Sequence, residues 1–126
     1  MKSIASPTAP KAIGPYAHAI RTGNLVYCSG QTPLDPHTMQ IESPDIEAQT
    51  ERVLRNLEIV LSTLDLTLAD VVKTNVYLAD MDLFSKMNAV YAKMFGEHCP
   101  ARTTVAVKGL PYHALVEIEC IAEINS

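Results

Sequence analysis

The sequence predicts an α+β fold, a sandwich whose elements follow one another in the order β-β-α-β-α-β-β. Two observations support this prediction. Two stretches have apolar residues at helical spacing, and several shorter stretches have the composition or alternation of strands, with turn signals between them. Two amphipathic helices of this kind would cover one face of a mixed sheet. The 126 residues suffice for one domain, which we expect to span residues 1–126.

Two short strands are predicted at residues 17–21 and 25–29. They flank Thr22-Gly23-Asn24, a sequence typical of a hairpin turn. The first fifteen residues are rich in Pro, Ala and Ser, and we expect them to lead into the fold as an extended arm. A loop is expected at 33–38, which contains two prolines.

The first long helix is predicted to start with Ser43 as its N-cap and Pro44 as its first helical residue. Apolar residues then recur at helical spacing and predict one buried stripe. The stripe consists of Ile46, Val53, Leu54, Leu57, Val60, Leu61 and Leu64. The opposite face is polar, and its residues are Glu51, Arg52, Arg55, Asn56 and Glu58.

A strand at 71–78 and a second helix follow. In the strand, one face would carry Val72, Thr74, Val76 and Leu78, and the other Lys73 and Asn75. In the helix, we expect Asp82 to be the N-cap and Gly96 to end the last turn. The buried side of this helix is predicted to contain Phe84, Met87, Tyr91, Met94 and Phe95.

The last two strands are predicted at 102–108 and 115–124, with a turn at 109–111 between them. In the final strand one apolar face would consist of Val116, Ile118, Cys120, Ala122 and Ile124. The second face of the sheet would carry polar residues mixed with a few aliphatic ones. These polar residues are Asn75, Tyr77, Arg102, Thr104, Glu117 and Glu119. The mixture indicates that another subunit covers part of this face, although a solvated face with a few exposed aliphatics has the same pattern.

Composition excludes several classes of protein. The net charge of −4 argues against a protein whose main task is to bind phosphate backbones. No stretch has the length and apolarity of a membrane span or a signal peptide, so we expect a cytoplasmic protein. The chain has an odd number of cysteines, three, and no C-x-x-C motif, which argues against a disulfide framework. Cys28 and Cys120 lie in apolar stretches and are expected to be small buried residues.

Motifs for metals, nucleotides and nucleophilic catalysis are also missing. The four histidines have no ligand spacing, and the zinc-deaminase pattern H-x-E…P-C-x-x-C does not occur. No G-x-G-x-x-G or Walker sequence is present. Ser29-Gly30 lacks the G-x-S-x-G context of a nucleophile and is more typical of a turn. We therefore expect neither a metal nor a cofactor.

Arg102 and Glu117 are the remaining candidates for chemistry. We expect them on adjacent strands of a tight pair, both on the face away from the helices. An arginine in a cleft can bind a carboxylate through two hydrogen bonds, and a nearby glutamate can activate water. An ordinary cross-strand ion pair explains the same spacing.

Five stretches resemble the Rid/YjgF family. They are 9–19 (APKAIGPYAHA), 26–36 (VYCSGQTPLDP), 88–91 (NAVY), 100–104 (PARTT) and 116–122 (VEIECIA). They occur in the family's order over nearly the whole chain, and they are most similar to the enamine/imine deaminases of the family. The resemblance implies a chorismate-mutase-like fold and a homotrimer with three clefts between subunits. It also implies the substrates 2-aminoacrylate and 2-aminocrotonate with their imine tautomers, which are hydrolysed to 2-oxo acids and ammonia.

The resemblance assigns roles residue by residue. Arg102 matches the arginine that holds the substrate carboxylate, Glu117 the acid that places the attacking water, and Tyr16 a tyrosine that lines the cleft. The matched substrate-binding positions are Ser29, Gly30 and Asn88.

The chain departs from the family at three positions. Thr104 stands where relatives often have Cys, and its hydroxyl could still bind a ligand oxygen. Ala17 replaces a frequent Ser and Met39 a frequent turn Gly. Three other functions remain open: a non-enzymatic regulatory protein that binds 2-oxo acids, an endoribonuclease, and a chaperone-like role on which the sequence is silent.

Overall fold

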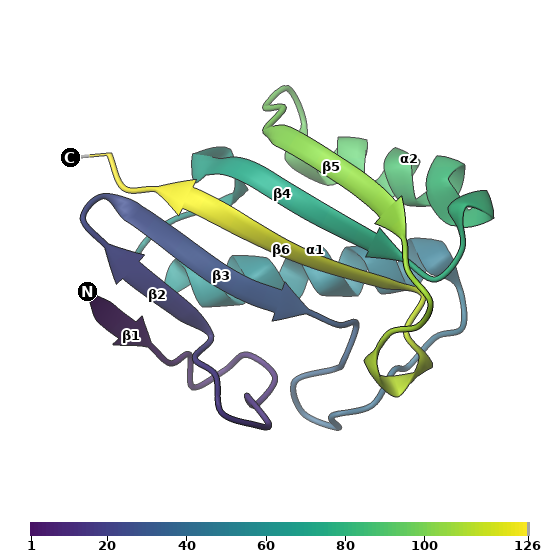
Figure 1. The fold of residues 1–126 in the computed structure, drawn as a ribbon, viewed down its shortest axis with the longest axis horizontal. Helices are drawn as coiled ribbons and strands as arrows, with labels where there is room; N and C mark the ends of the chain where they lie inside the picture. Colours follow the sequence, from purple (N-terminus) through teal and green to yellow (C-terminus); the bar gives the residue numbers. More distant parts are fainter. Residues whose placement is uncertain (126) are drawn as a thin grey trace.

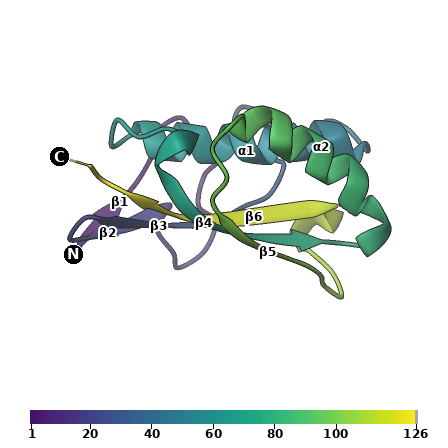
Figure 2. The same ribbon diagram turned by 90° about the horizontal axis from the view of Figure 1, so that it is seen from above.

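The computed structural model describes residues 1–125, so Ser126, the last residue of the predicted domain, lies outside the described residues. Two helices pack on one face of a mixed sheet, as predicted, and the other face is open (Figures 1 and 2). The sheet has six strands, one more than predicted. The strands are β1 (Lys2–Ile4), β2 (Ala19–Thr22), β3 (Leu25–Gln31), β4 (Val71–Leu78), β5 (Ala101–Ala106) and β6 (Val116–Glu123). The helices are α1 (Ile46–Ser62) and α2 (Phe84–Phe95), with short 3-10 turns η1 (Leu68–Asp70), η2 (Met81–Leu83) and η3 (Pro111–His113).

The strand order is β1-β2-β3-β6-β4-β5. Only the β4–β5 pair is parallel, and β5 forms an edge of the sheet. Strand β1 was not predicted, because three residues are too short to show an alternating pattern. It pairs with β2, which places Ile4 opposite Ala19 and buries both side chains. Part of the expected extended arm therefore belongs to the sheet.

The core lies between the helices and the sheet. The predicted stripe of α1 is buried, except that Leu64, beyond the end of the helix, is only partly so. Val116, Ile118, Cys120 and Ala122 of β6 face this stripe. Each fully buried aliphatic side chain contributes roughly 1.5–3 kcal/mol relative to an exposed one. Cys28 lies opposite Cys120 across the β3–β6 pair, and both are buried free thiols, as expected.

Both helices begin differently from the prediction. Asp45, in extended conformation, is the N-cap residue of α1, so Ser43 and Pro44 precede the helix. The Ser43 hydroxyl instead accepts a hydrogen bond from the Asp45 N–H (3.1 Å) in the turn before it. The N-cap of α2 is Leu83 rather than Asp82, and Asp80 instead caps η2, which precedes the helix. Local side-chain bonds of this kind occur wherever Ser or Asp can reach a nearby N–H.

A bulge in β4 changes the alternation at its start. Val71 pairs with Ala122 and Lys73 with Ile121, which leaves Val72 as the extra residue. Val72 is 42% exposed, so the prediction that it shares a face with Thr74 is wrong. The remaining alternation of β4 is as predicted, because a bulge shifts the register by only one residue.

Candidate functional site

Arg102 lies on the edge strand β5 and faces helix α2. It is paired with Thr74, whose hydroxyl is hydrogen-bonded to the Tyr91 hydroxyl of α2 (2.7 Å). The guanidinium lies over the Tyr91 ring at 4.7 Å and the Phe84 ring at 5.5 Å, and Nη1 donates to Asn88 Oδ1 at 2.7 Å. Two aromatic faces and one acceptor hold the group in place. Within residues 1–125 it donates to this one acceptor, so most of its five N–H donors remain available.

A cavity of about 420 Å³ lies beside this guanidinium, and we call it the arginine pocket. Its lining includes Asn88, Tyr91, Cys99 and Arg102. Thr104 follows on the same face of β5, and its buried hydroxyl has no hydrogen-bond partner among the described residues. A buried hydroxyl without a partner costs about 1–3 kcal/mol. Thr104 is thus a candidate to bind an atom from outside this chain.

A second cavity, of about 440 Å³, opens on the other face of the sheet, and we call it the glutamate pocket. Its lining includes Tyr16, Ser29, Gly30 and Glu117. Gly30 permits a close approach, because an added Cβ would collide with the Glu117 carboxylate and lie 3.0 Å from its Cδ. The β3 backbone therefore lies directly against this acid.

The charge of Glu117 is disfavoured by its surroundings. Burial raises the pKa of the Glu117 carboxyl, and the nearby Glu119 carboxylate raises it further. Glu119 is held by the Tyr77 hydroxyl, which donates to Oε1 at 2.8 Å, and by the Asn75 amide at 3.5 Å. The same hydrogen bond to Glu119 raises the pKa of Tyr77. An acid with a raised pKa beside a cavity is a candidate for proton transfer.

Tyr16 is placed by the turn that precedes it. Gly14 has φ +127°, a conformation that favours glycine, and its carbonyl accepts from the Tyr16 N–H at 3.0 Å. The Ser29 hydroxyl donates to the Ala17 carbonyl at 2.7 Å, so this side chain attaches the arm to β3. This contact agrees with the structural interpretation of Ser29. His18 has both ring nitrogens occupied, by the Ser6 N–H and the Pro10 carbonyl.

The two pockets lie on opposite faces of the sheet, which corrects the predicted arrangement of Arg102 and Glu117. Strand β4 separates β5 from β6, so the two residues are not on adjacent strands. Arg102 and Thr104 face the helices, whereas Glu117 is paired with Tyr77 on the open face. The predicted cross-strand ion pair is therefore also wrong. The nine-residue connection between the strands lets β5 lie parallel to β4, instead of forming a hairpin with β6.

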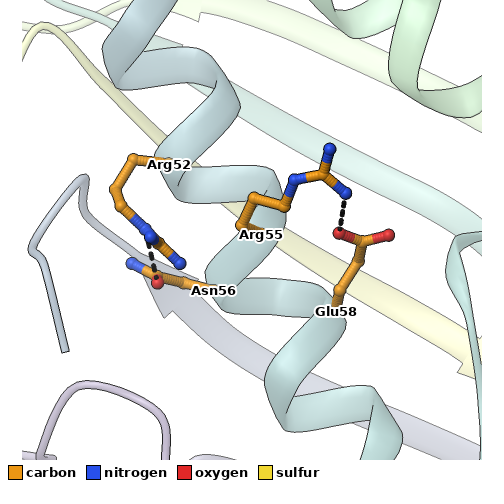
Figure 3. A network of polar contacts seen from close by, with 4 residues as sticks. All are labelled: Arg52, Arg55, Asn56 and Glu58. Carbon is orange, nitrogen blue, oxygen red and sulfur yellow. Dashed lines mark hydrogen bonds and ion pairs between the residues drawn. The ribbon is translucent and has the colours of Figure 1, made fainter.

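Sequence reasoning missed two polar residues of α1 that support the glutamate pocket. Asn56, predicted on the solvent face, is completely buried, and its amide donates to the carbonyls of Thr32 and Leu34. Arg52 donates to Asn56 Oδ1 at 3.1 Å, whereas Arg55 and Glu58 form a separate exposed pair (Figure 3). Gln49, one heptad before Asn56, is buried in the same way. The seven-residue spacing, which places Gln49 and Asn56 on the same face of α1, is the signal in the sequence that links these two residues.

Residues 1–125 contain neither a cluster of metal-binding side chains nor a helix suited to crossing a membrane. Among residues 1–125, no three His, Cys, Asp or Glu side chains gather as a metal ion would require. None of the helices described in this part of the chain combines the length and apolarity needed to span a bilayer.

Comparison with known proteins gives consistent matches over the whole chain. The family model described as Endoribonuclease L-PSP matches residues 6–124. A RutC family protein of Pyrococcus horikoshii is 50% identical over 119 residues, 94% of each chain. A 2-iminobutanoate/2-iminopropanoate deaminase of Salmonella typhimurium is 40% identical and covers 96% of each chain. A Lactococcus lactis protein, 44% identical over the full length of both chains, is named as a candidate regulator, AldR.

Solved structures confirm the predicted fold class. The YjgF gene product of Escherichia coli superposes with a TM-score of 0.94 at 38% identity, covering 99% of this chain and 100% of its own. Escherichia coli TdcF, solved with bound serine, gives 0.93 at 35% identity, with 99% and 100% covered. The two-helix, six-strand sandwich is common to all three proteins.

Proposed function

Because this chain belongs to the Rid/YjgF family, we propose that it hydrolyses reactive enamine and imine acids to 2-oxo acids and ammonia. The proposed substrates are 2-aminoacrylate and 2-aminocrotonate with their imine tautomers. The observation that carries the proposal is the arginine pocket. A guanidinium with free donors is oriented by Asn88 and two aromatic rings, and the unpaired Thr104 hydroxyl follows two residues later on the same face of β5. That combination suits a small carboxylate.

The proposal requires more than one subunit. Arg102 and Glu117 lie on opposite faces, so one chain cannot apply both to a single small substrate. A cyclic homotrimer would bring the β5 edge of each subunit to the glutamate pocket of the next, since head-to-tail contacts join two different surfaces. Tyr27 and Val105 are exposed on the open face and support an interface there. Three equivalent clefts would result.

In the proposed mechanism, Arg102 and Thr104 of one subunit hold the carboxylate. A water molecule at Glu117 of the neighbouring subunit attacks the imine carbon, and Glu117 accepts a proton from this water and passes it to the nitrogen. In the resulting tetrahedral amino alcohol the hydroxyl proton moves to the nitrogen, the C–N bond breaks, and ammonia and the 2-oxo acid are released. Tyr16 and the Gly30 N–H supply hydrogen bonds to the reacting group, and Tyr16 can move a proton. Acid–base catalysis of this kind contributes about 10²–10⁴-fold, and we expect no metal or cofactor to take part because imines hydrolyse readily.

A coupled assay tests the proposal. A serine or threonine dehydratase generates the enamine, and release of the 2-oxo acid is followed with and without this protein. We expect wild type to accelerate release and Arg102→Ala to lose about 100-fold or more of kcat/KM, because the substrate carboxylate loses its charged partner. Arg55→Ala, which removes an exposed arginine from α1, is the matched control and should behave as wild type. Full turnover by Arg102→Ala would contradict the assignment.

A regulatory protein that binds 2-oxo acids is the second candidate, and the name of the Lactococcus lactis relative favours it. It would use Arg102 in the same way but without turnover. Binding of a 2-oxo acid without any acceleration of release would support this alternative. Endoribonuclease activity, named in the family model, is disfavoured by the net charge of −4.

A further inference from the structure

The connection between β5 and β6 contains two consecutive residues in the left-handed conformation. Tyr112 has φ 60° and ψ 20°, and His113 has φ 56°. Side chains other than Gly, Asn and Asp seldom adopt this conformation, because Cβ approaches the following carbonyl. Such strain persists only where the surrounding structure imposes it, and it is concentrated at functional sites.

Hydrogen bonds hold the C-terminal end of this connection. Ala114 is buried, and its N–H donates to the Pro111 carbonyl at 3.1 Å. The Leu115 N–H donates to Gln49 Oε1 at 2.8 Å, and the same Gln49 amide donates to the Ser43 carbonyl at 2.8 Å. The connection extends on the side of the sheet away from the helices (Figure 2). Helix α1 thus holds the backbone at Leu115, three residues after Tyr112.

Tyr112 belongs to an apolar rim around the glutamate pocket. The pocket is lined by Ile13, Tyr16 and Tyr112, which are 65%, 49% and 52% exposed, together with the polar Ser29 and Glu117. One exposed apolar side chain needs no explanation. Three around a single cavity form a surface on which an apolar group can be buried.

We propose that Tyr112 is a specificity-determining residue whose ring packs against the alkyl group of the substrate. The inference rests on the proposed function, because it takes the carboxylate to bind at Arg102 and the imine carbon to lie at Glu117. The alkyl group is then the remaining part of the substrate, and the apolar rim is the remaining part of the pocket. The ethyl group of 2-iminobutanoate therefore gains more from the Tyr112 ring than the methyl group of 2-iminopropanoate.

Three substitutions test this role. Tyr112→Asn removes the ring but keeps a residue that tolerates the left-handed conformation. His113→Asn makes the same change at the adjacent left-handed residue, which does not line the pocket. Tyr112→Phe keeps the ring and removes the hydroxyl. Tyr112 and His113 are both exposed, so folding should be preserved in all three variants, and circular dichroism checks this.

The measured quantity is the ratio of kcat/KM for the ethyl substrate to that for the methyl substrate. We expect Tyr112→Asn to lower this ratio about four-fold, the contribution of one buried methylene, and the other two variants to leave it unchanged. Titration with 2-oxobutanoate and 2-oxopropanoate should give the same change in the ratio of affinities. An unchanged ratio in Tyr112→Asn, in a wild type that turns over both substrates, would overturn the role of Tyr112 and leave the deaminase function intact.

The two proposals can fail separately. A wild type that binds both 2-oxo acids without turnover would contradict the deaminase function, and a shifted affinity ratio in Tyr112→Asn would then still support the role of Tyr112. A wild type that neither binds nor turns over these compounds would overturn both.

Discussion

The arginine pocket and the glutamate pocket are built in different ways. Helix α2, the loop that follows it and the edge strand β5 form the arginine pocket, and its lining residues lie within fifteen positions of one another, from Asn88 to Arg102. The glutamate pocket takes its lining from the N-terminal arm, the end of β3, the β5–β6 connection and β6. Its geometry therefore depends on contacts between distant segments, such as Gly30 with Glu117. Changes in that pocket should affect catalysis separately from carboxylate binding.

The largest effect that separates the two pockets is expected from Gly30→Ala. The new Cβ must displace the Glu117 carboxylate, and a catalytic group misplaced by about 1 Å can cost 10²-fold in rate. We expect kcat to fall about 100-fold while 2-oxo acid binding through Arg102 changes little. Gly109→Ala is the control, because an added Cβ there meets nothing within 4 Å. Equal loss of binding and turnover in Gly30→Ala would show that the pockets are not separable.

A large effect on stability is expected from Asn56→Ala. The substitution leaves the carbonyls of Thr32 and Leu34 without their donor, next to the glutamate pocket. Two lost buried hydrogen bonds cost about 2–3 kcal/mol, which lowers the melting temperature by roughly 10 °C. The comparison is Glu58→Ala, which breaks the exposed pair with Arg55 and should cost less than about 1 kcal/mol. Similar melting temperatures for the two variants would contradict the structural role of Asn56.

A smaller, pH-dependent effect is expected from Glu117→Gln. Burial raises the pKa of Glu117 above its value in the unfolded chain, so the folded state binds this proton more tightly. The resulting stabilisation is complete below about pH 4, near the unfolded pKa of Glu, and is lost as the pH rises through the folded pKa. Relative to Glu117→Gln, wild type should therefore lose thermal stability as the pH rises above about 4. If the melting temperatures of wild type and Glu117→Gln changed in parallel with pH, the Glu117 carboxyl would be as well solvated in the folded chain as in the unfolded one.

The smallest effect is expected from Met39→Gly. Met39 has φ 58° in the loop that follows Leu34, a residue that lines the glutamate pocket. Glycine adopts this conformation without strain. We expect a gain of about 0.5–1 kcal/mol after the entropy cost of glycine, or roughly 2–4 °C in melting temperature. Asp65→Gly is the control at φ 58°, where aspartate already tolerates the conformation and the gain should be smaller. Equal gains in melting temperature at both positions would show that Met39 carries no more backbone strain than Asp65.

The helices, most strands and most of their buried faces follow from local patterns in the sequence. The stripe of α1 and the alternation of β6 are local patterns whose period is set by backbone geometry, so they could be predicted without knowing any neighbour. The resemblance to the Rid/YjgF family also singled out six of the residues that line the two pockets. It could not say which of them share a face within one chain.

The arrangement of the strands and pockets depends instead on contacts between distant parts of the chain. Strand β5 lies beside β4 rather than β6, and Arg102 turns toward α2, because the parallel pairing with β4 places it next to Thr74. A shift of one residue in register moves every side chain of a strand to the other face, and such a shift leaves no trace in the local sequence. Asn56 was buried for a similar reason: its acceptors, the carbonyls of Thr32 and Leu34, belong to a loop more than twenty residues away. Contacts between distant segments fix these features, and a local pattern carries no information about them.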